Sequence, residues 1–311
     1  VRRWPPCPTG WLTASAQPDS DVTEGSMTWK ASIFQFFHIS IERLQEAVTM
    51  IFARSSDSAG WIGAELFGPD VEFSGVDTDS RHVRPDALFV ALKGARYDGH
   101  DHLDEARSRG AAAAQVARHL PTSLPLLVAE DTVPALGRLA AAWMRRFHLP
   151  VIAVLGSNGK TTVKELAASI FMQREGNAVL ATQGNRNNAI GIPLTLFDLD
   201  PRHRAAILEL GASGPGEITC LGKMALPDLA IITNAGLDHL AGFGGRAGAA
   251  RANGEIFSVM DRNGIAVLNG DDECLTIWRK QAGTPGPVYG SDSSRTWRYG
   301  VFGGNISTAA S

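Results

Sequence analysis

Short, nearly continuous apolar runs recur through the second half of the chain, with stretches of mixed helical character between them. The runs cover Val151–Leu155, Ala178–Ala181, Ala205–Leu210, Leu229–Thr233 and Ile265–Leu268. Strands that are covered on both faces show such runs, whereas half-exposed strands alternate between apolar and polar residues. The pattern therefore predicts an α/β fold with a doubly wound parallel sheet, in which ligands bind at the carboxyl ends of the strands.

The part of the chain before Pro150 also alternates between strand and helix patterns and predicts a separate α/β domain over residues 70–149. Its predicted elements are strands at Val71–Val76, Ala87–Leu92 and Leu126–Ala129, and helices at Leu103–Arg118 and Thr132–Phe147 with Thr132 as N-cap. The second domain is placed at residues 150–290. Residues 1–69 form a separate N-terminal segment whose first part is rich in Pro, Ser and Asp and is expected to be disordered. Residues 291–311 lack periodicity and are expected to form an irregular tail.

The most informative segment is Gly156-Ser-Asn-Gly-Lys-Thr-Thr162, which follows a predicted strand and opens a helical pattern. In such a turn, backbone N–H groups and the positive end of the helix dipole face phosphate groups. Lys160 would contact the β and γ phosphate oxygens, and the Thr161 hydroxyl would help to bind Mg²⁺. The sequence therefore predicts a nucleoside triphosphate site.

The helix after this loop is predicted to end at Gly176 and to pack one apolar face on the sheet. Lys164 is expected to lie off that face. The face itself is predicted to consist of Val163, Leu166, Ala167, Ile170 and Phe171.

Polar side chains end three of the other apolar runs. Glu209 precedes a glycine turn, the run before Asn234 leads on to His239, and Asn269 follows the last run. A carboxylate and an imidazole at neighbouring strand ends could hold a divalent cation beside the phosphates. Taken singly, Glu209 also fits a solvated strand-end charge, and His239 fits a packed or surface histidine.

The composition argues against several classes of protein. The 29 Lys and Arg residues against 32 Asp and Glu residues give a net charge of −3, so no nucleic-acid surface is indicated. The three cysteines, Cys7, Cys220 and Cys274, lie far apart and indicate neither a disulfide framework nor a zinc site. The chain contains no apolar run long enough for a membrane span, and its start lacks the apolar region of a secretory signal. We therefore expect a cytoplasmic protein.

Several segments resemble the Mur peptide ligases, in the order in which that family carries them. They are Asp79–Arg81, Leu88–Gly94, Asp98–Asp101, Gly156–Glu165, Thr182–Asn188, Ile190–Thr195, Glu209–Ala212, Asn234–Gly236 with His239, Arg251–Phe257 and Asn269–Asp272. The Thr182–Asn188 and Glu209–Ala212 segments resemble most the branch of the family that adds D-alanyl-D-alanine to UDP-N-acetylmuramoyl-tripeptide.

The resemblance implies an ATP-dependent amide ligase of peptidoglycan precursor synthesis, with a UDP-sugar-binding domain at residues 70–149 and an ATP-binding domain at residues 150–290. The implied ligands are ATP, Mg²⁺, the UDP-sugar tripeptide and D-alanyl-D-alanine, and the reaction would pass through an acyl phosphate. We expect a monomer. The implied nucleotide-binding residues are Gly156, Ser157, Asn158, Gly159, Lys160, Thr161, Thr162 and Asn269. The implied metal ligands are Thr161, Glu209 and His239, the catalytic residues Lys160, Glu209 and His239, and the substrate-binding residues Ser80, Arg81, Asn187 and Asn188.

The chain also departs from the family pattern. Asn253 stands where the family usually has a lysine that becomes carbamylated and helps to place a second Mg²⁺. Ala189 and Ala241 replace glutamates, and Leu155 replaces a threonine. The family carries a third domain that closes over ATP, for which the sequence after Asp272 shows no match.

Two alternatives stay open. One is a non-catalytic remnant or paralogue that binds nucleotide and UDP-sugar, which Asn253 and the missing third domain favour. The other is the sibling ligase that adds the third amino acid, which shares the Asp79–Arg81 and Asp98–Asp101 segments.

Overall fold

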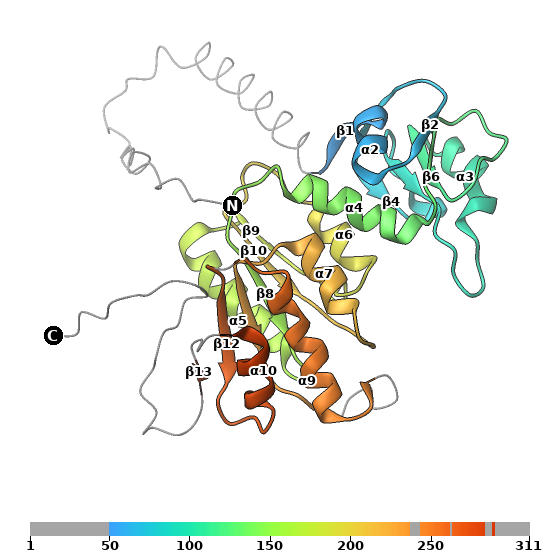
Figure 1. Cartoon of the computed structure of the whole chain (residues 1–311). Helices are drawn as coiled ribbons and strands as arrows, with labels where there is room; N and C mark the ends of the chain where they lie inside the picture. The colour runs from blue at the N-terminus through green and yellow to red at the C-terminus, as the bar shows by residue number, and fades with distance from the viewer. Residues whose placement is uncertain (1–49, 237–242, 262, 284–287, 290–311) are drawn as a thin grey trace, which may run out of the picture. The chain divides into compact units, whose positions relative to one another are not determined.

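The computed structural model describes residues 50–236, 243–261, 263–283 and 288–289. In this part the chain forms two open sheets and a two-stranded ribbon, with helices packed on them (Figure 1). The helices are α2 (Ser55–Ile62), α3 (Leu103–Ser108), α4 (Thr132–Met144), α5 (Lys160–Glu175), α6 (Gly191–Leu196), α7 (Glu217–Ala225), α9 (Arg246–Gly254) and α10 (Leu275–Ala282), with short 3₁₀ turns at Ser80–His82, Gly99–His102 and Glu255–Ser258. The strands are β1 (Phe52–Arg54), β2 (Glu65–Phe67), β3 (Glu72–Ser74), β4 (Val76–Asp77), β5 (Leu88–Val90), β6 (Ala113–Val116), β7 (Leu126–Val128), β8 (Val151–Leu155), β9 (Val179–Ala181), β10 (Ala205–Glu209), β11 (Leu229–Ile232), β12 (Ile265–Asn269) and β13 (Val288–Tyr289).

Strands β8 to β13 form a parallel sheet in the order β13-β12-β11-β8-β10-β9. All residues of β8 and β10 are buried. Their side chains alternate between the two faces of the sheet, so an unbroken apolar run is needed to cover both. The predicted doubly wound parallel sheet is confirmed.

Each face of this sheet is covered by different helices. Ile152 and Val154 belong to the cluster packed against α5, whereas Val151, Ala153 and Leu155 belong to the cluster that includes residues of α4, α6, α7, α9 and α10. The strand order changes direction at β8, because the chain first adds β9 and β10 on one side and then β11 on the other. Ligands of open α/β sheets bind at the carboxyl ends of the strands beside such a change.

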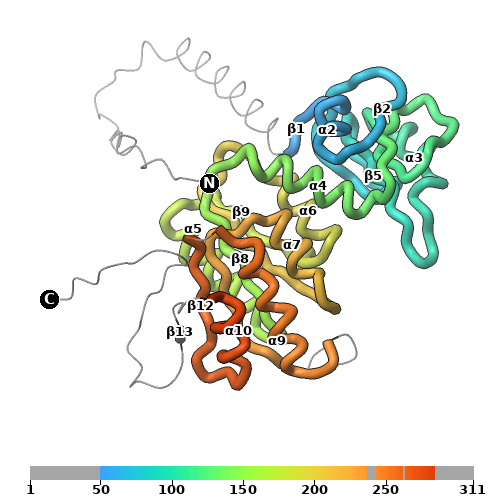
Figure 2. Tube along the Cα trace, in the orientation of Figure 1, coloured from blue at the N-terminus to red at the C-terminus, as the bar shows by residue number. Residues whose placement is uncertain are grey.

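The first sheet has the order β2-β7-β6-β5-β4, with β2 antiparallel to β7 and the other neighbours parallel. Figure 2 shows the chain running from this sheet through α4 into β8. The domain start predicted at residue 70 stays a prediction, but β1, α2 and β2 precede it, and β2 is an edge strand of this sheet.

Three predicted elements of the first domain are wrong in detail. The strand predicted over Val71–Val76 is interrupted at Gly75, so that β3 pairs with β1 and β4 joins the five-stranded sheet. The helix predicted over Leu103–Arg118 ends at Ser108, and Ala113–Val116 is a fully buried strand. Gly110, at φ +94°, turns the chain between them, and burial of Ala113 and Ala114 in the sheet overrides the helix propensity of alanine. The N-cap of α4 is Asp131 instead of Thr132, because the Asp131 carboxylate accepts the Val133 N–H at 3.0 Å.

The buried face of α5 also differs from the prediction. Leu166 and Ile170 are 60% and 66% exposed, whereas Lys164 is only 1% exposed. The stripe that faces the sheet contains Val163, Lys164, Ala167, Ala168 and Phe171. Two adjacent stripes of this helix carry apolar residues, so periodicity alone could not select the one that meets the sheet.

Within the described residues, no helix is both long enough and apolar enough to cross a membrane.

Candidate functional site

The glycine-rich loop connects β8 to the first turn of α5, as predicted. Gly156 has φ +124°, and a Cβ built on it would lie 2.1 Å from the Thr233 hydroxyl oxygen. Gly159, at φ +78°, is the N-cap of α5. Only glycine satisfies both the left-handed backbone and the close approach at Gly156, so this loop conformation depends on that residue.

Residues that follow β11 hold the loop in place. The Ser157 N–H donates to the Asn234 carbonyl at 3.0 Å, and the Asn158 N–H donates to the Asn234 side-chain oxygen at 3.0 Å. The Thr233 hydroxyl donates to the Asn158 carbonyl at 2.7 Å. The loop is therefore held in place by hydrogen bonds to the end of a neighbouring strand.

The Lys160 ammonium lies within this loop. It donates to the carbonyl oxygens of Gly156 at 2.7 Å and Ser157 at 2.8 Å. The positive charge is thus held beside the N-terminal end of α5, where the helix dipole also favours an anion.

The Glu209 carboxylate lies against the first turn of α5, where three of the predicted site residues meet. One of its oxygens accepts the Thr161 hydroxyl at 2.9 Å, and the other accepts the Asn187 side-chain N–H at 2.9 Å. Glu209 is only 3% exposed. A hydroxyl and a carboxylate are hard oxygen donors of the kind that Mg²⁺ prefers, so this pair fits one side of a magnesium site.

The remaining predicted metal ligand, His239, lies outside the described residues, as does Ala241. In the described ranges no three His, Cys, Asp or Glu side chains are grouped so as to hold a metal ion. The Mg²⁺ site predicted from Thr161, Glu209 and His239 stays a prediction, supported by the contact between the first two.

Two predicted ligand-binding asparagines are engaged with the backbone around them. The Asn188 side-chain oxygen accepts the N–H groups of Ile190 at 3.1 Å and Gly191 at 2.9 Å, at the start of α6. The Asn269 side chain donates to the Thr233 carbonyl at 2.9 Å and accepts the Asp271 N–H at 3.0 Å. These bonds fix the loops that border the site, and the predicted contacts with ligands stay predictions.

Asn253 reaches the glycine-rich loop from α9. Its side-chain oxygen accepts the Gly156 N–H at 3.1 Å, and its side-chain nitrogen donates to the Ala249 carbonyl at 3.0 Å. No local sequence pattern indicates this contact, because the two residues are 97 positions apart.

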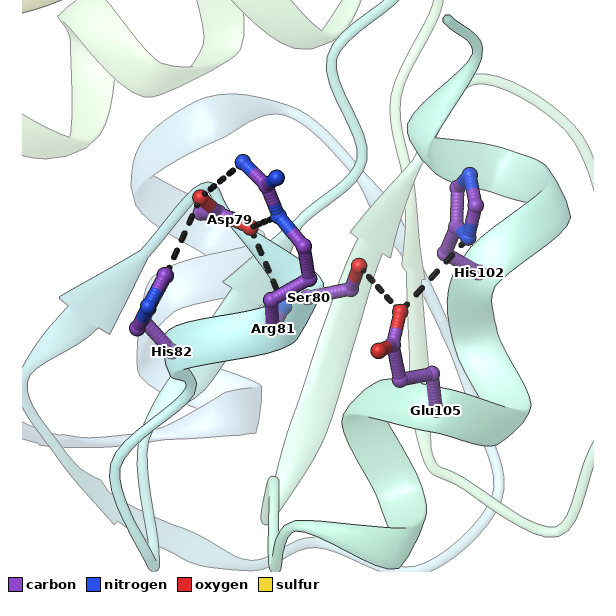
Figure 3. A network of polar contacts seen from close by, with 6 residues as sticks. All are labelled: Asp79, Ser80, Arg81, His82, His102 and Glu105. Atoms are coloured by element: carbon purple, nitrogen blue, oxygen red, sulfur yellow. Dashed lines mark hydrogen bonds and ion pairs between the residues drawn. The ribbon is translucent and has the colours of Figure 1, made fainter.

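Ser80 and Arg81 lie in the first domain, in the turn shown in Figure 3. Ser80 is buried, and its hydroxyl donates to the Glu105 carboxylate at 2.7 Å. The Arg81 guanidinium is 71% exposed and forms a two-point contact with Asp79. Its hydrogen bonds hold the pKa of the Asp79 carboxyl well below its usual range. Of the two predicted residues, Arg81 is the one that faces solvent.

Two clefts lie beside the predicted substrate-binding residues or their sequence neighbours. The larger, of about 1090 Å³, lies between α4 and α7 and reaches Asn188, Ala189 and Gly211 beside the carboxyl ends of the strands. The smaller, of about 370 Å³, is lined by charged groups that include Asp79, Arg84 and Arg186.

The parallel sheet, the glycine-rich loop opening α5 and the buried carboxylate at the next strand end define an α/β protein of the phosphate-loop class. The family model described as Mur ligase middle domain matches residues 154–300, and the one described as Mur ligase family, catalytic domain, matches residues 72–143. The chain belongs to the Mur ligase family.

Named relatives point to one branch of this family. The chain is 43% identical over 252 residues to the UDP-N-acetylmuramoyl-tripeptide–D-alanyl-D-alanine ligase of Escherichia coli (strain K12), covering 80% of this chain and 53% of that protein. It is 38% identical over 232 residues to the ligase of the same name from Bacillus subtilis (strain 168), covering 73% of this chain and 50% of that protein. The chain thus spans about half the length of the curated relatives that it matches.

Solved structures agree with this assignment. A crystal structure of MurF from Acinetobacter baumannii matches with a TM-score of 0.75 at 34% identity, over 79% of this chain and 55% of that chain. A crystal structure of MurF ligase from Thermotoga maritima in complex with ADP matches with a TM-score of 0.65 at 34% identity, over 70% of this chain and 51% of that chain. The resemblance to the D-alanyl-D-alanine-adding branch is confirmed.

Proposed function

We propose that this chain carries the UDP-sugar-binding and ATP-binding domains of a ligase that joins D-alanyl-D-alanine to UDP-N-acetylmuramoyl-tripeptide in peptidoglycan synthesis. The observation that carries the proposal is the contact of Thr161 with the buried Glu209 at the first turn of α5, in a chain 43% identical to a ligase of that name. A cytoplasmic location and a monomeric state stay predictions.

ATP would bind with its phosphates at the loop from Gly156 to Thr162. Lys160 would turn from the loop carbonyls towards the β and γ phosphates, with the helix dipole adding to the attraction. Thr161 and Glu209 would hold Mg²⁺, with His239 as a further ligand. When bound, the ion would offset the negative charge on the phosphate oxygens. Asn269 would lie on the adenine side.

The reaction would proceed in two displacements. An oxygen of the tripeptide's terminal carboxylate forms a bond to the γ-phosphorus while the bond to ADP breaks, which leaves an acyl phosphate. The amine of D-alanyl-D-alanine then attacks the acyl carbon, and phosphate and a proton leave. Lys160 supplies positive charge where charge develops on the transferred group, which is the main requirement of phosphoryl transfer.

The UDP-sugar end of the substrate would bind on the side of Arg81, whose exposed guanidinium suits pyrophosphate or carbonyl oxygens. Ser80 would act indirectly, since its hydroxyl is engaged with Glu105. Asn187 and Asn188 would lie at the peptide end, since Asn187 contacts Glu209 and Asn188 lines the larger cleft.

The direct test measures ADP release by the purified chain with MgATP, UDP-N-acetylmuramoyl-tripeptide and D-alanyl-D-alanine, omitting each substrate in turn. ADP formation that requires all three supports the ligase. Nucleotide binding is measured in parallel by calorimetry. A folded chain that binds MgATP without releasing ADP would support a binding function, and a folded chain that does not bind MgATP would contradict the nucleotide site itself.

One observation favours a non-catalytic binding function as the second candidate. The side chain at the position of the family lysine is Asn253, which carries no charge and already bonds the Gly156 N–H and the Ala249 carbonyl. A carboxamide in that position cannot provide the anion that a carbamylated lysine would. Both candidates bind MgATP, so the measurement of ADP release is the arm of the test that separates this candidate from the ligase.

A further inference from the structure

Lys164 is a buried charged residue to which the proposed mechanism gives no role. We propose that it is a positioning residue, which sets the place of the Glu209 carboxylate through Thr182. This inference rests on the proposed function, because it concerns the metal side of the same nucleotide site.

The burial of Lys164 is unusual for its type. It is 1% exposed and ranks among the largest fully buried side chains of the described residues. Lysine is almost never buried without a partner, and an apolar side chain of similar volume is often at least as stabilising as a buried ion pair. Packing of α5 on the sheet therefore does not explain why this position carries an ammonium group.

The partners of the ammonium lie on its own helix and at the end of β9. It forms an ion pair with Glu165, whose side chain is 64% exposed, and it donates to the Thr182 carbonyl at 2.9 Å. Glu165 belongs to the same helix and is open to solvent, so the contact that links two elements is the one to Thr182.

Thr182 connects Lys164 to the metal side of the site. It is 1% exposed, and its hydroxyl oxygen accepts the Glu209 N–H at 3.0 Å. Its own N–H donates to the Ile207 carbonyl at 3.0 Å, which continues the pairing of β9 with β10. The Lys164 ammonium is therefore linked to the Glu209 backbone by two hydrogen bonds, both of which are made by the buried Thr182.

These contacts close a ring between α5, β9 and β10. Thr161 and Lys164 are three residues apart, so they lie on the same side of α5. Thr161 bonds the Glu209 carboxylate, while Lys164 reaches the Glu209 backbone through Thr182. Glu209 is thus held at its backbone and at its carboxylate. Magnesium requires near-ideal octahedral geometry, so a small displacement of this carboxylate would weaken metal binding more than nucleotide binding alone.

The experiment measures the affinity of the full chain for a non-hydrolysable ATP analogue by calorimetry, once with Mg²⁺ and once with EDTA. The ratio of the two affinities reports the contribution of the metal. Lys164→Met is expected to lower this ratio about tenfold, which corresponds to about 1.4 kcal/mol, while the affinity in EDTA stays within about twofold of wild type. A combined Lys164→Met and Glu209→Gln variant should lose little more than Glu209→Gln alone, because the two residues act through one contact chain.

Two matched comparisons separate positioning from packing. Glu165→Gln removes the ion pair but keeps the bond from Lys164 to Thr182, so the ratio should not change. Thr182→Val removes the acceptor for the Glu209 N–H and should lower the ratio, whereas Thr182→Ser should restore it. If Lys164→Met does not fold, the two Thr182 variants carry the test.

The outcomes are distinct. Equal losses with and without Mg²⁺ would show that Lys164 serves packing, and an unchanged ratio in Lys164→Met or Thr182→Val would overturn the inference. A wild-type chain that is folded but shows no affinity for the analogue would contradict the proposed nucleotide site, and the inference with it.

Discussion

Replacing Asn253 by alanine should destabilise the domain that contains β8 and α5 by removing a contact to the glycine-rich loop. The Asn253 side-chain oxygen accepts the N–H of Gly156, which is buried. Alanine leaves that donor without this acceptor, and a buried donor that loses its partner costs about 1–3 kcal/mol. Alanine is the better helix former within α9 by about 0.5 kcal/mol, which offsets part of the loss. The free energy of unfolding should therefore fall by about 0.5–2.5 kcal/mol.

Urea unfolding followed by circular dichroism measures this change, with the midpoint and slope recorded for each variant. Asn253→Asp is the matched control, because it keeps an oxygen acceptor at the same position and should retain most of the stability. Asn253→Lys, whose side chain has no acceptor, should lose stability as alanine does. Equal stability of wild type and Asn253→Ala, at an unchanged slope, would refute the argument that this contact holds the loop.

Three further predictions concern other parts of the fold. Lys160→Ala should weaken MgATP binding by about tenfold or more, since it removes the ammonium beside the loop; calorimetry checks this, and an unchanged affinity would remove the phosphate-loop assignment. Burial raises the pKa of the Asp198 carboxyl, so the stability linked to this group is complete below its ordinary pKa of about 4 and is lost as pH rises through the folded-state value. Asp198→Asn should therefore gain stability over wild type at pH 7 and lose that advantage near pH 4, and urea titrations that give a constant difference across this range would contradict it. Asp131→Ala should lower the free energy of unfolding by about 1 kcal/mol by removing the cap on the Val133 N–H, whereas Asp131→Ser should restore it; equal stability of the two variants would count against the cap.

Local sequence patterns were sufficient to predict those elements whose structure depends mainly on the residues of one short segment. The short, unbroken apolar run of β8 favours a strand covered on both faces, and the glycine-rich turn after it favours a connection to a helix. Glu209 was found for the same reason, because a carboxylate that ends a buried strand must lie at the ligand-binding edge of the sheet.

Residue patterns were therefore enough to predict the class of fold, the glycine-rich loop and the strand ends that surround it. The stripe of α5 that is buried, the presence of Lys164 in that stripe, and the bond from Asn253 to the loop 97 residues away follow from the packing of the folded chain. Hydrophobic periodicity reports the ability of a segment to bury a face, and it is read over a few neighbouring residues. Which of two apolar stripes is buried depends on how the helix packs against the sheet. Which group a side chain bonds depends on which distant backbone groups lie within reach once the elements have packed.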